Sequence, residues 1–304
     1  MSCKTRHASS VEAPGILRRL IKPALGLGLV VALLAQLQLS ELRRVLESAQ
    51  WSWAVLAFVL ACSANLTCAL RWRAIVTQLD QPLTAWQAIT LYFQGVTTNT
   101  VLPGGIIGGD VWRTLGLSKI GMTTSDAARS VLLDRASGFW ALSFIALGAF
   151  LLHLGIGERP EVNAPTLLQM VFYALILIIS MAPLVLWKIN PKLIRITVGS
   201  AAISVISQAL TIAAFVCCLL AVQAEFSILA VTIFCAGIFL AAVVPASIGG
   251  FGSRELASVF FLTAVGIQSE TAFLGSVLFG LTATAQGLLS LPSWLSGERE
   301  KNSD

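Results

Sequence analysis

The sequence is poor in charged residues and in histidine. Lys, Arg, Asp and Glu make up 12% of the 304 residues, about half of the ~25% that is usual for a soluble domain. The two histidines and six cysteines do not have the spacing of a metal site. No Asp-x-Asp and no nucleotide-binding motif occurs. We therefore expect no metal and no cofactor, and the composition argues against a soluble enzyme.

Long apolar runs are abundant instead, since 56% of the residues are hydrophobic. A helix needs about 20 residues to cross the ~30 Å hydrocarbon core of a bilayer. Seven runs approach that length, and an eighth is apolar but rich in Gln, Asn and Thr. The seven cover residues 23–39, 51–70, 138–154, 167–187, 201–222, 228–244 and 271–291, and the eighth covers 86–102. The period-two alternation of a transmembrane barrel is absent.

The fold class that follows is all-α: a polytopic transmembrane helical bundle of about seven or eight spans. We expect a single transmembrane domain over residues 17–295, between a polar cytoplasmic tail (1–16) and a short polar tail (296–304). No small-residue cleavage site follows run 23–39, so this run is expected to remain as the first span. The expected location is the inner (plasma) membrane, as a multi-pass protein.

Basic residues in short loops indicate the cytoplasmic side. The N-terminal tail is basic, Arg71 and Arg73 follow the second run, and a basic loop follows the run 167–187, whereas loop 155–164 is acidic. The N-terminus is therefore expected in the cytoplasm. Because Arg73 and the start of the next clear span lie on the same side, the chain between them should enter the membrane and return, as a re-entrant hairpin. Polar groups at that depth need protein or water around them.

The turn of this hairpin holds the first group of candidate binding residues. Proline ends a helix, and four glycines allow a tight turn that exposes backbone N–H and C=O groups. Asp110 and Arg113 are three residues apart and can pair on one helical face. The alternative is an ordinary interhelical loop with a capped helix starting at Asp110. The candidates are Asn99, Pro103, Gly104, Gly108, Gly109, Asp110 and Arg113.

A second stretch has the same order of apolar run, proline, glycines and charged pair, and Pro245 follows Pro103 by 142 residues. This suggests a weak internal repeat. Paired interrupted segments in two halves are typical of the central site of a transporter, and the N-termini of broken helices favour an anion such as a lipid phosphate. The candidates here are Pro245, Gly249, Gly250, Gly252, Arg254 and Glu255.

A third charged group, Asp134 and Arg135, leads into the span that starts at residue 138. We include both residues as candidates for binding the head group. The alternative for Arg135 is anchoring at the cytoplasmic membrane surface, with Asp134 balancing its charge.

These residues together resemble a known family. Arg71-Trp72, Asn99 with Leu102-Pro103-Gly104, Gly109-Asp110 with Arg113, Asp134-Arg135, and Pro245 through Gly252-Ser253-Arg254-Glu255 are similar to the lysylphosphatidylglycerol synthase transmembrane region family, also described as flippase-like. The resemblance implies a bundle related to the lipid-flipping part of these synthases. The chain ends at Asp304, which leaves no room for an aminoacyl-transferase domain, so lipid synthesis is not expected.

The sequence departs from the family at one position, because the common Leu-Pro-Gly-Arg is Leu102-Pro103-Gly104-Gly105 here. An arginine at that position cannot contribute to head-group binding in this chain. Relatives that act in polyprenyl-glycan or hopanoid pathways leave the cargo open.

The functional hypothesis is a translocase for an anionic phospholipid or a polyprenyl-phosphate lipid. The first alternative is a membrane-embedded glycosyltransferase that uses polyprenyl-phosphate sugars, but such chemistry needs an acidic base and the first outer loop offers only Glu41 and Glu47. The second is an accessory protein for a separate lipid-modifying enzyme or glycosyltransferase. The net charge of +5 does not indicate nucleic acid, because the basic residues lie at membrane edges.

Overall fold

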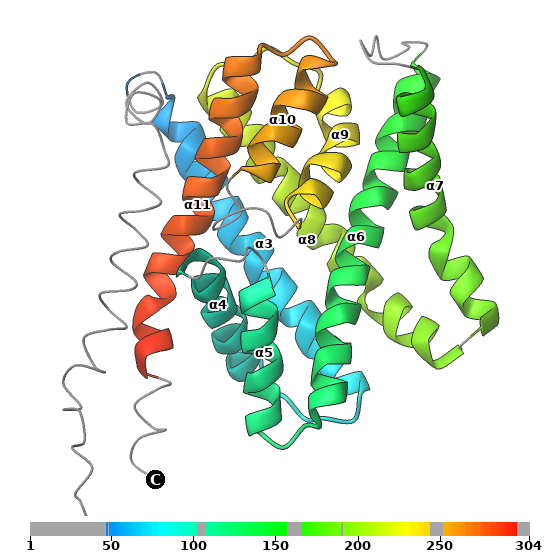
Figure 1. The fold of residues 1–304 in the computed structure, drawn as a ribbon, viewed down its shortest axis with the longest axis vertical. Helices are drawn as coiled ribbons and strands as arrows, with labels where there is room; N and C mark the ends of the chain where they lie inside the picture. Colours follow the sequence, from blue (N-terminus) through cyan, green and yellow to red (C-terminus); the bar gives the residue numbers. More distant parts are fainter. Residues whose placement is uncertain are drawn as a thin grey trace, which may run out of the picture.

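In the computed structural model, every element of regular structure among the described residues is a helix (Figure 1). The structure describes residues 47, 49–101, 107–156, 166–189, 191–243 and 252–296, and for 101, 184–189, 191–197 and 294–296 it describes the backbone alone. The helices are α3 (Trp51–Gln78), α4 (Ala85–Val101), α5 (Ile107–Lys119), α6 (Thr124–Gly155), α7 (Thr166–Ile189), α8 (Pro191–Ala221), α9 (Ile228–Ala241), α10 (Ser253–Thr263) and α11 (Ser269–Ser296).

Within the described residues, five helices are long and apolar enough to cross a membrane: α3, α6, α7, α8 and α11. They correspond to five of the eight predicted runs, so the prediction of a polytopic helical membrane bundle is confirmed. Run 23–39 and the two predicted tails, 1–16 and 296–304 apart from Ser296, lie outside the described residues. The two remaining runs form α4 and α9, and both differ from simple spans.

The most extensive contact between two helices is that between α3 and α8, which pack against each other along most of their length (Figure 1). Helix α3 presents a stripe of buried small residues, Ala54, Ala57, Ala61 and Ala64. Two of them, Ala54 and Ala57, pack in one cluster with buried residues near the end of α8. Small residues let helix backbones approach closely where apolar burial alone cannot drive association.

Helices α4 and α5 form a hairpin that enters the bundle and returns to the same end. The side chain of Gln81, before α4, donates to the backbone of Ile120, just after α5 (3.3 Å). At about 1.5 Å per residue, α4 is about 26 Å long and α5 about 20 Å, and neither helix continues to the opposite end (Figure 1). The predicted return of the chain is observed. We call this end of the molecule, at the bottom of Figure 1, the Gln81 end.

Helices α9 and α10 form a second hairpin, which enters from the opposite end (Figure 1). Run 228–244 was listed as a candidate span followed by an interruption at proline and glycines, and the helix that it forms is shorter than a full span. Helix α9 stops at Ala241 after 14 residues, too short for about 30 Å of hydrocarbon, and α10 leads back to where α9 began. Ala224 before α9 and Ile267 after α10 belong to one apolar cluster. We call this the Ala224 end. Helix α11 then runs back to the Gln81 end.

Each hairpin has an apolar core of its own. Around α4 and α5, the core joins Trp72 and Val76 of α3 to Leu117 of α5 and Val131 of α6. Around α9 and α10, a larger core joins residues of α6, α8 and α11 to the hairpin, with Phe215 of α8 fully buried. The chain therefore holds two short hairpins, from opposite ends, inside a frame of long helices.

Most of the polar side chains of α4 face protein, as predicted from their density, whereas Gln87 in its first turn is exposed. Gln94, Thr97, Thr98 and Thr100 are buried. Thr97 shares a hydrogen bond with Ser290 of α11 (2.5 Å). Interhelical hydrogen bonds of this kind hold helices together in a bilayer, where apolar contacts with lipid compete with packing.

Two details of the predicted spans are wrong for the same reason, namely that the helices extend beyond the apolar runs. Helix α3 continues to Gln78, so Arg71 is a buried helical residue and not part of a cytoplasmic loop. Helix α6 begins at Thr124, so Asp134 and Arg135 lie within the helix and not at the entrance of a span. Both extensions bring charge inside the bundle.

Candidate functional site

A cavity of about 190 Å³ lies where the inner ends of the two hairpins meet. The first hairpin contributes the end of α4 and the start of α5, and the second contributes the end of α9 and the start of α10. Helices α3, α6 and α11 complete the wall. The lining residues are Asn65, Tyr92, Gly95, Val96, Asn99, Thr100, Gly109, Asp110, Arg113, Arg135, Ala242, Arg254 and Ala283. Three arginines and one aspartate thus face a single space.

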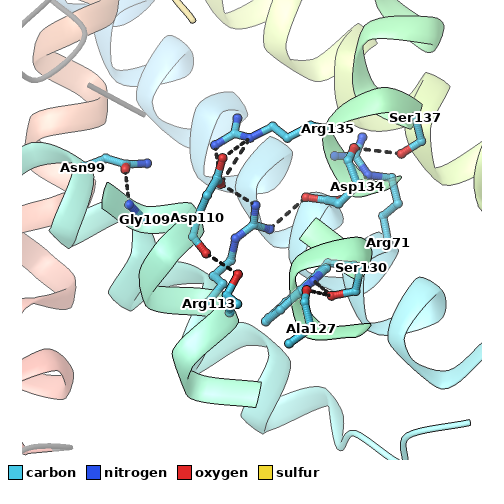
Figure 2. Close-up of polar contacts among 12 residues, drawn as sticks. Arg71, Asn99, Gly109, Asp110, Arg113, Ala127, Ser130, Asp134, Arg135 and Ser137 are labelled. Atoms are coloured by element: carbon cyan, nitrogen blue, oxygen red, sulfur yellow. Dashed lines mark hydrogen bonds and ion pairs between the residues drawn. The ribbon is translucent and has the colours of Figure 1, made fainter. Parts of the chain in front are cut away.

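Beside the cavity, five charged residues form an alternating chain across three helices (Figure 2). Arg71 donates from Nε to Asp134 Oδ1 (2.8 Å), and Arg113 donates from Nη1 to Asp134 Oδ2 (2.8 Å). The other nitrogen of Arg113, Nη2, donates to Asp110 Oδ1 (2.9 Å). Arg135 then donates to Asp110 from Nε (3.1 Å) and Nη2 (2.8 Å). Because buried charges are tolerated only when paired and hydrogen-bonded, this chain explains how α3, α5 and α6 accommodate them.

One end of this row of five charged residues is buried and the other end is exposed. The side chains of Arg71, Asp134 and Arg113 are at most 4% exposed, whereas those of Asp110 and Arg135 are 26% and 30% exposed. The inner three fix helices to one another, and the outer pair faces the cavity.

Aromatic rings fix Arg113 further. Its guanidinium carbon lies 5.0 Å from the ring centre of Trp72 and 4.8 Å from that of Tyr92. Trp72 is held in turn, because its Nε1 donates to Ser130 Oγ (3.2 Å). A cation over an aromatic face gains about 0.5–2 kcal/mol, more when water is excluded. Arg113 therefore has little freedom to reach a ligand.

The two helices of the first hairpin cross at glycines. The backbone N–H of Gly109 donates to Asn99 Oδ1 (2.6 Å), which closes the hairpin next to the cavity. A Cβ atom on Gly109 would lie 2.4 Å from the carbonyl oxygen of Gly95 and 2.6 Å from Asn99 Oδ1. The close approach at this crossing thus requires glycine.

Gly109→Ala is therefore expected to destabilise the protein by about 1–3 kcal/mol, because the clash is with backbone that cannot move away. Gly148→Ala is the matched control, since Gly148 is an exposed residue in the middle of α6 whose added Cβ meets nothing within 4 Å. Alanine there should be neutral or stabilise the helix. Thermal unfolding of the two purified variants in the same detergent measures the difference, and equal midpoints would contradict the predicted crossing.

On the second hairpin, Arg254 lies in the first turn of α10 and reaches the cavity. It pairs with Glu255 and donates from Nε to Ser276 Oγ of α11 (3.2 Å). Glu255 also accepts from the backbone N–H of Gly252 (2.6 Å) and closes the N-terminus of the helix. Gly252 has φ +108°, a conformation that favours glycine.

Six of the predicted site residues line the cavity together: Asn99, Gly109, Asp110, Arg113, Arg135 and Arg254. Asp134 and Glu255 lie behind the lining and hold arginines in place. Gly108 and Gly252 belong to the starts of α5 and α10 and do not line the cavity. Pro103, Gly104, Pro245, Gly249 and Gly250 lie outside the described residues.

The sequence reasoning missed Arg71 and Tyr92 as parts of the site. Arg71 was interpreted as a loop residue because it follows an apolar run, while its partner Asp134 is 63 residues away. An arginine and an aspartate within predicted apolar helices, each lacking a partner nearby in sequence, would have been the available signal. Tyr92 carries no such signal, because only the fold brings its ring to Arg113.

Comparison with known proteins agrees with the resemblance found in the sequence. No curated protein matches the chain. The model of one protein family, described as the lysylphosphatidylglycerol synthase TM region, matches residues 19–290. With its helical bundle and this match over most of its length, the chain belongs to the lysylphosphatidylglycerol synthase transmembrane region family.

Proposed function

We propose that this protein is a translocase for a membrane lipid with a small anionic, phosphate-containing head group. One observation carries the proposal: three arginines face a single cavity at the junction of two short hairpins that enter the bundle from opposite ends. Arginine binds phosphate oxygens through paired N–H donors, which makes phosphate the ligand that best fits this lining.

The placement of the hairpins supports movement of a head group from one side to the other. Two half-length helices, α5 and α10, start at the cavity, so the positive ends of both helix dipoles are directed toward it. Broken helices of this type surround the central sites of many transporters, where rocking of one part against another exposes the site alternately to each side. Here the first hairpin covers the cavity on the Gln81 side and the second covers it on the Ala224 side.

The size of the cavity is compatible with a small head group. Its volume of about 190 Å³ is many times the ~10–15 Å³ that a single water needs. A phosphate with a short polar substituent fits that space. The favoured partner is therefore an anionic phospholipid or a polyprenyl phosphate.

The carboxylates near the cavity favour a translocase over a glycosyltransferase. A transferase needs a carboxylate that can accept a proton or hold a metal. Asp110 and Asp134 each accept from two arginines, and Glu255 from Arg254 and a backbone N–H. In these arrangements the carboxylate oxygens already accept hydrogen bonds from other groups of the protein.

We also propose that the Gln81 end faces the cytoplasm. Arg73, Lys119 and Arg129 lie in the parts of α3, α5 and α6 near this end, as expected for the cytoplasmic side. In a chain without its native cysteines, the single cysteine of Ser125→Cys, an exposed position at this end of α6, should not react with a membrane-impermeant reagent in intact cells.

The function is tested in vesicles that contain the purified protein and lipids with a fluorescent label on a hydrocarbon chain. Chemical quenching of the outer leaflet measures translocation of phosphatidylglycerol, phosphatidylcholine and a polyprenyl phosphate in separate samples, which separates the possible sources of the phosphate. We expect faster translocation of one or both anionic lipids than in protein-free vesicles. If no lipid moves faster, the proposal fails.

Arg135→Gln is expected to slow the translocation of the active lipid by about tenfold or more. Hydrogen bonds to charged groups contribute about 1.5–3 kcal/mol, and 1.4 kcal/mol is a factor of ten. Arg129→Gln is the matched control, because Arg129 lies on the same helix but is 66% exposed and outside the cavity. Equal rates for the two variants would contradict a head-group role for Arg135.

A further inference from the structure

The cavity contains an anion of its own, the carboxylate of Asp110. Arg135 binds it with two nitrogens, and Arg113 with one. This geometry, with a planar guanidinium facing two oxygens, is the one with which arginine also binds a phosphate. Asp110 therefore occupies donors that a lipid phosphate would need.

Arg135 is the partner that can be exchanged. Its side chain is 30% exposed, and the contacts described for it are with Asp110. Arg113 is 4% exposed, is bound to Asp134 as well, and lies against two aromatic rings. A ligand entering the cavity can thus reach Arg135 at much lower cost than Arg113.

Release of Arg135 leaves no carboxylate unpaired. Asp110 keeps its bond to Arg113 Nη2 (2.9 Å), and Asp134 keeps both Arg71 and Arg113. The usual penalty of a buried, unpaired charge is therefore avoided when the pair opens. Because the charged residues alternate, Arg135 at the exposed end of the row can leave Asp110 at a low cost in free energy.

We infer that Asp110 is an internal competitor for the lipid phosphate: its carboxylate pairs with Arg135 when the cavity is empty, yields to the phosphate on binding, and takes Arg135 back as the head group leaves. This inference rests on the proposed function and adds a reason for release. A carrier must bind its cargo strongly enough to take it up and weakly enough to let it go. The competing carboxylate lowers the affinity of the cavity for the lipid phosphate and shortens the time for which the lipid stays bound.

Glu255, the carboxylate on the second hairpin, does not have this role. Glu255 does not line the cavity, and one of its oxygens accepts from the backbone of Gly252 at the start of α10. Arg254 and Glu255 are also only 7% and 5% exposed, so this pair is less accessible to a ligand than Arg135 and Asp110. The competition is therefore specific to the first hairpin.

The test combines binding and translocation of phosphatidylglycerol by Asp110→Asn. With purified full-length protein in detergent, calorimetric titration of dihexanoyl-phosphatidylglycerol should show about tenfold tighter binding by Asp110→Asn than by wild type. Translocation of the long-chain lipid in vesicles should be slower in the same variant. A purely structural defect would weaken binding, so tighter binding with slower transport is the distinguishing result.

Asp126→Asn is the matched control. Like Asp110, Asp126 lies in the first turn of its helix and pairs with an arginine three residues later, but it is 42% exposed and outside the cavity. It should bind and translocate like wild type. If Asp110→Asn does not fold, Asp110→Ser makes the same comparison, because serine is neutral and has a helix propensity similar to that of aspartate.

Three outcomes would overturn the inference, and they differ in whether the proposed translocase function is retained. Equal phosphatidylglycerol affinity in Asp110→Asn and wild type removes the competition but leaves the translocase. Weaker binding of dihexanoyl-phosphatidylethanolamine by the variant would show that Asp110 instead binds the ammonium group of a head group. Absence of binding and translocation by the wild type removes the proposed function, and this inference with it.

Discussion

Asp134→Asn is expected to destabilise the protein by about 3–5 kcal/mol, which exceeds the effect expected of Gly109→Ala. Asp134 accepts from Arg71 and Arg113, and all three side chains are buried. An amide group carries no charge and turns an N–H₂ toward one of the two arginines. Removing one member of a buried ion pair costs this much because the remaining charge stays buried without a partner.

The effect is measured as the shift in the midpoint of thermal unfolding, with Asp126→Asn as the control. Asp126 also pairs with an arginine, but on the surface, where such pairs contribute about 1 kcal/mol or less. A second substitution sharpens the test: Arg71→Met in the Asp134→Asn chain removes one unpaired cation and should recover part of the lost stability. Similar midpoints for Asp134→Asn and Asp126→Asn would mean that the buried ion pairs of Asp134 with Arg71 and Arg113 do not hold the helices together.

The sequence was sufficient to predict the membrane bundle and the first hairpin. Apolar runs specify spans because the hydrocarbon core imposes a fixed length, and the bias of basic residues showed that the chain around residue 100 must return. For α9 the sequence predicted an interruption at Pro245 but not the early end of the helix at Ala241, because the run is as apolar as a full span. Hydropathy does not indicate where a helix ends when the end is buried inside the protein. The apolar core that contains Phe215 of α8 and Val231 of α9 explains why a short apolar helix is stable there.

For the site, local patterns predicted some pairs and missed the long-range ones. Asp110 and Arg113 were expected to pair from their spacing, and they do. The contacts of Arg71 with Asp134 and of Arg135 with Asp110 join residues 63 and 25 positions apart. No periodicity encodes such contacts, since they depend on how α3, α5 and α6 pack. The exposed fractions that separate Arg135 from Arg113 also depend on packing, although both are arginines beside an aspartate.

The second large effect is expected if one head group contacts both Arg135 and Arg254. Arg135 lies beside the first hairpin and Arg254 on the second, and both line the same cavity. Arg135→Gln removes a charge from the cavity, and Arg254→Lys keeps the charge that Glu255 requires while removing the paired donors of a guanidinium. Each is expected to slow lipid translocation in vesicles, by about tenfold or more for Arg135→Gln and by several-fold for Arg254→Lys.

The double variant distinguishes one shared site from two separate ones. If a single phosphate contacts both arginines in the rate-limiting state, loss of the first contact removes most of the benefit of the second, and the combined effect will be smaller than the product of the two single effects. Residues that share a partner typically show interaction energies of about 0.5–3 kcal/mol, whereas independent sites add within about 0.5 kcal/mol. A product that holds within that margin would mean that Arg135 and Arg254 bind the lipid in separate steps, with the head group passing from one to the other. Non-additivity would mean that α6, beside the first hairpin, and α10 of the second hairpin hold the phosphate at once in one site.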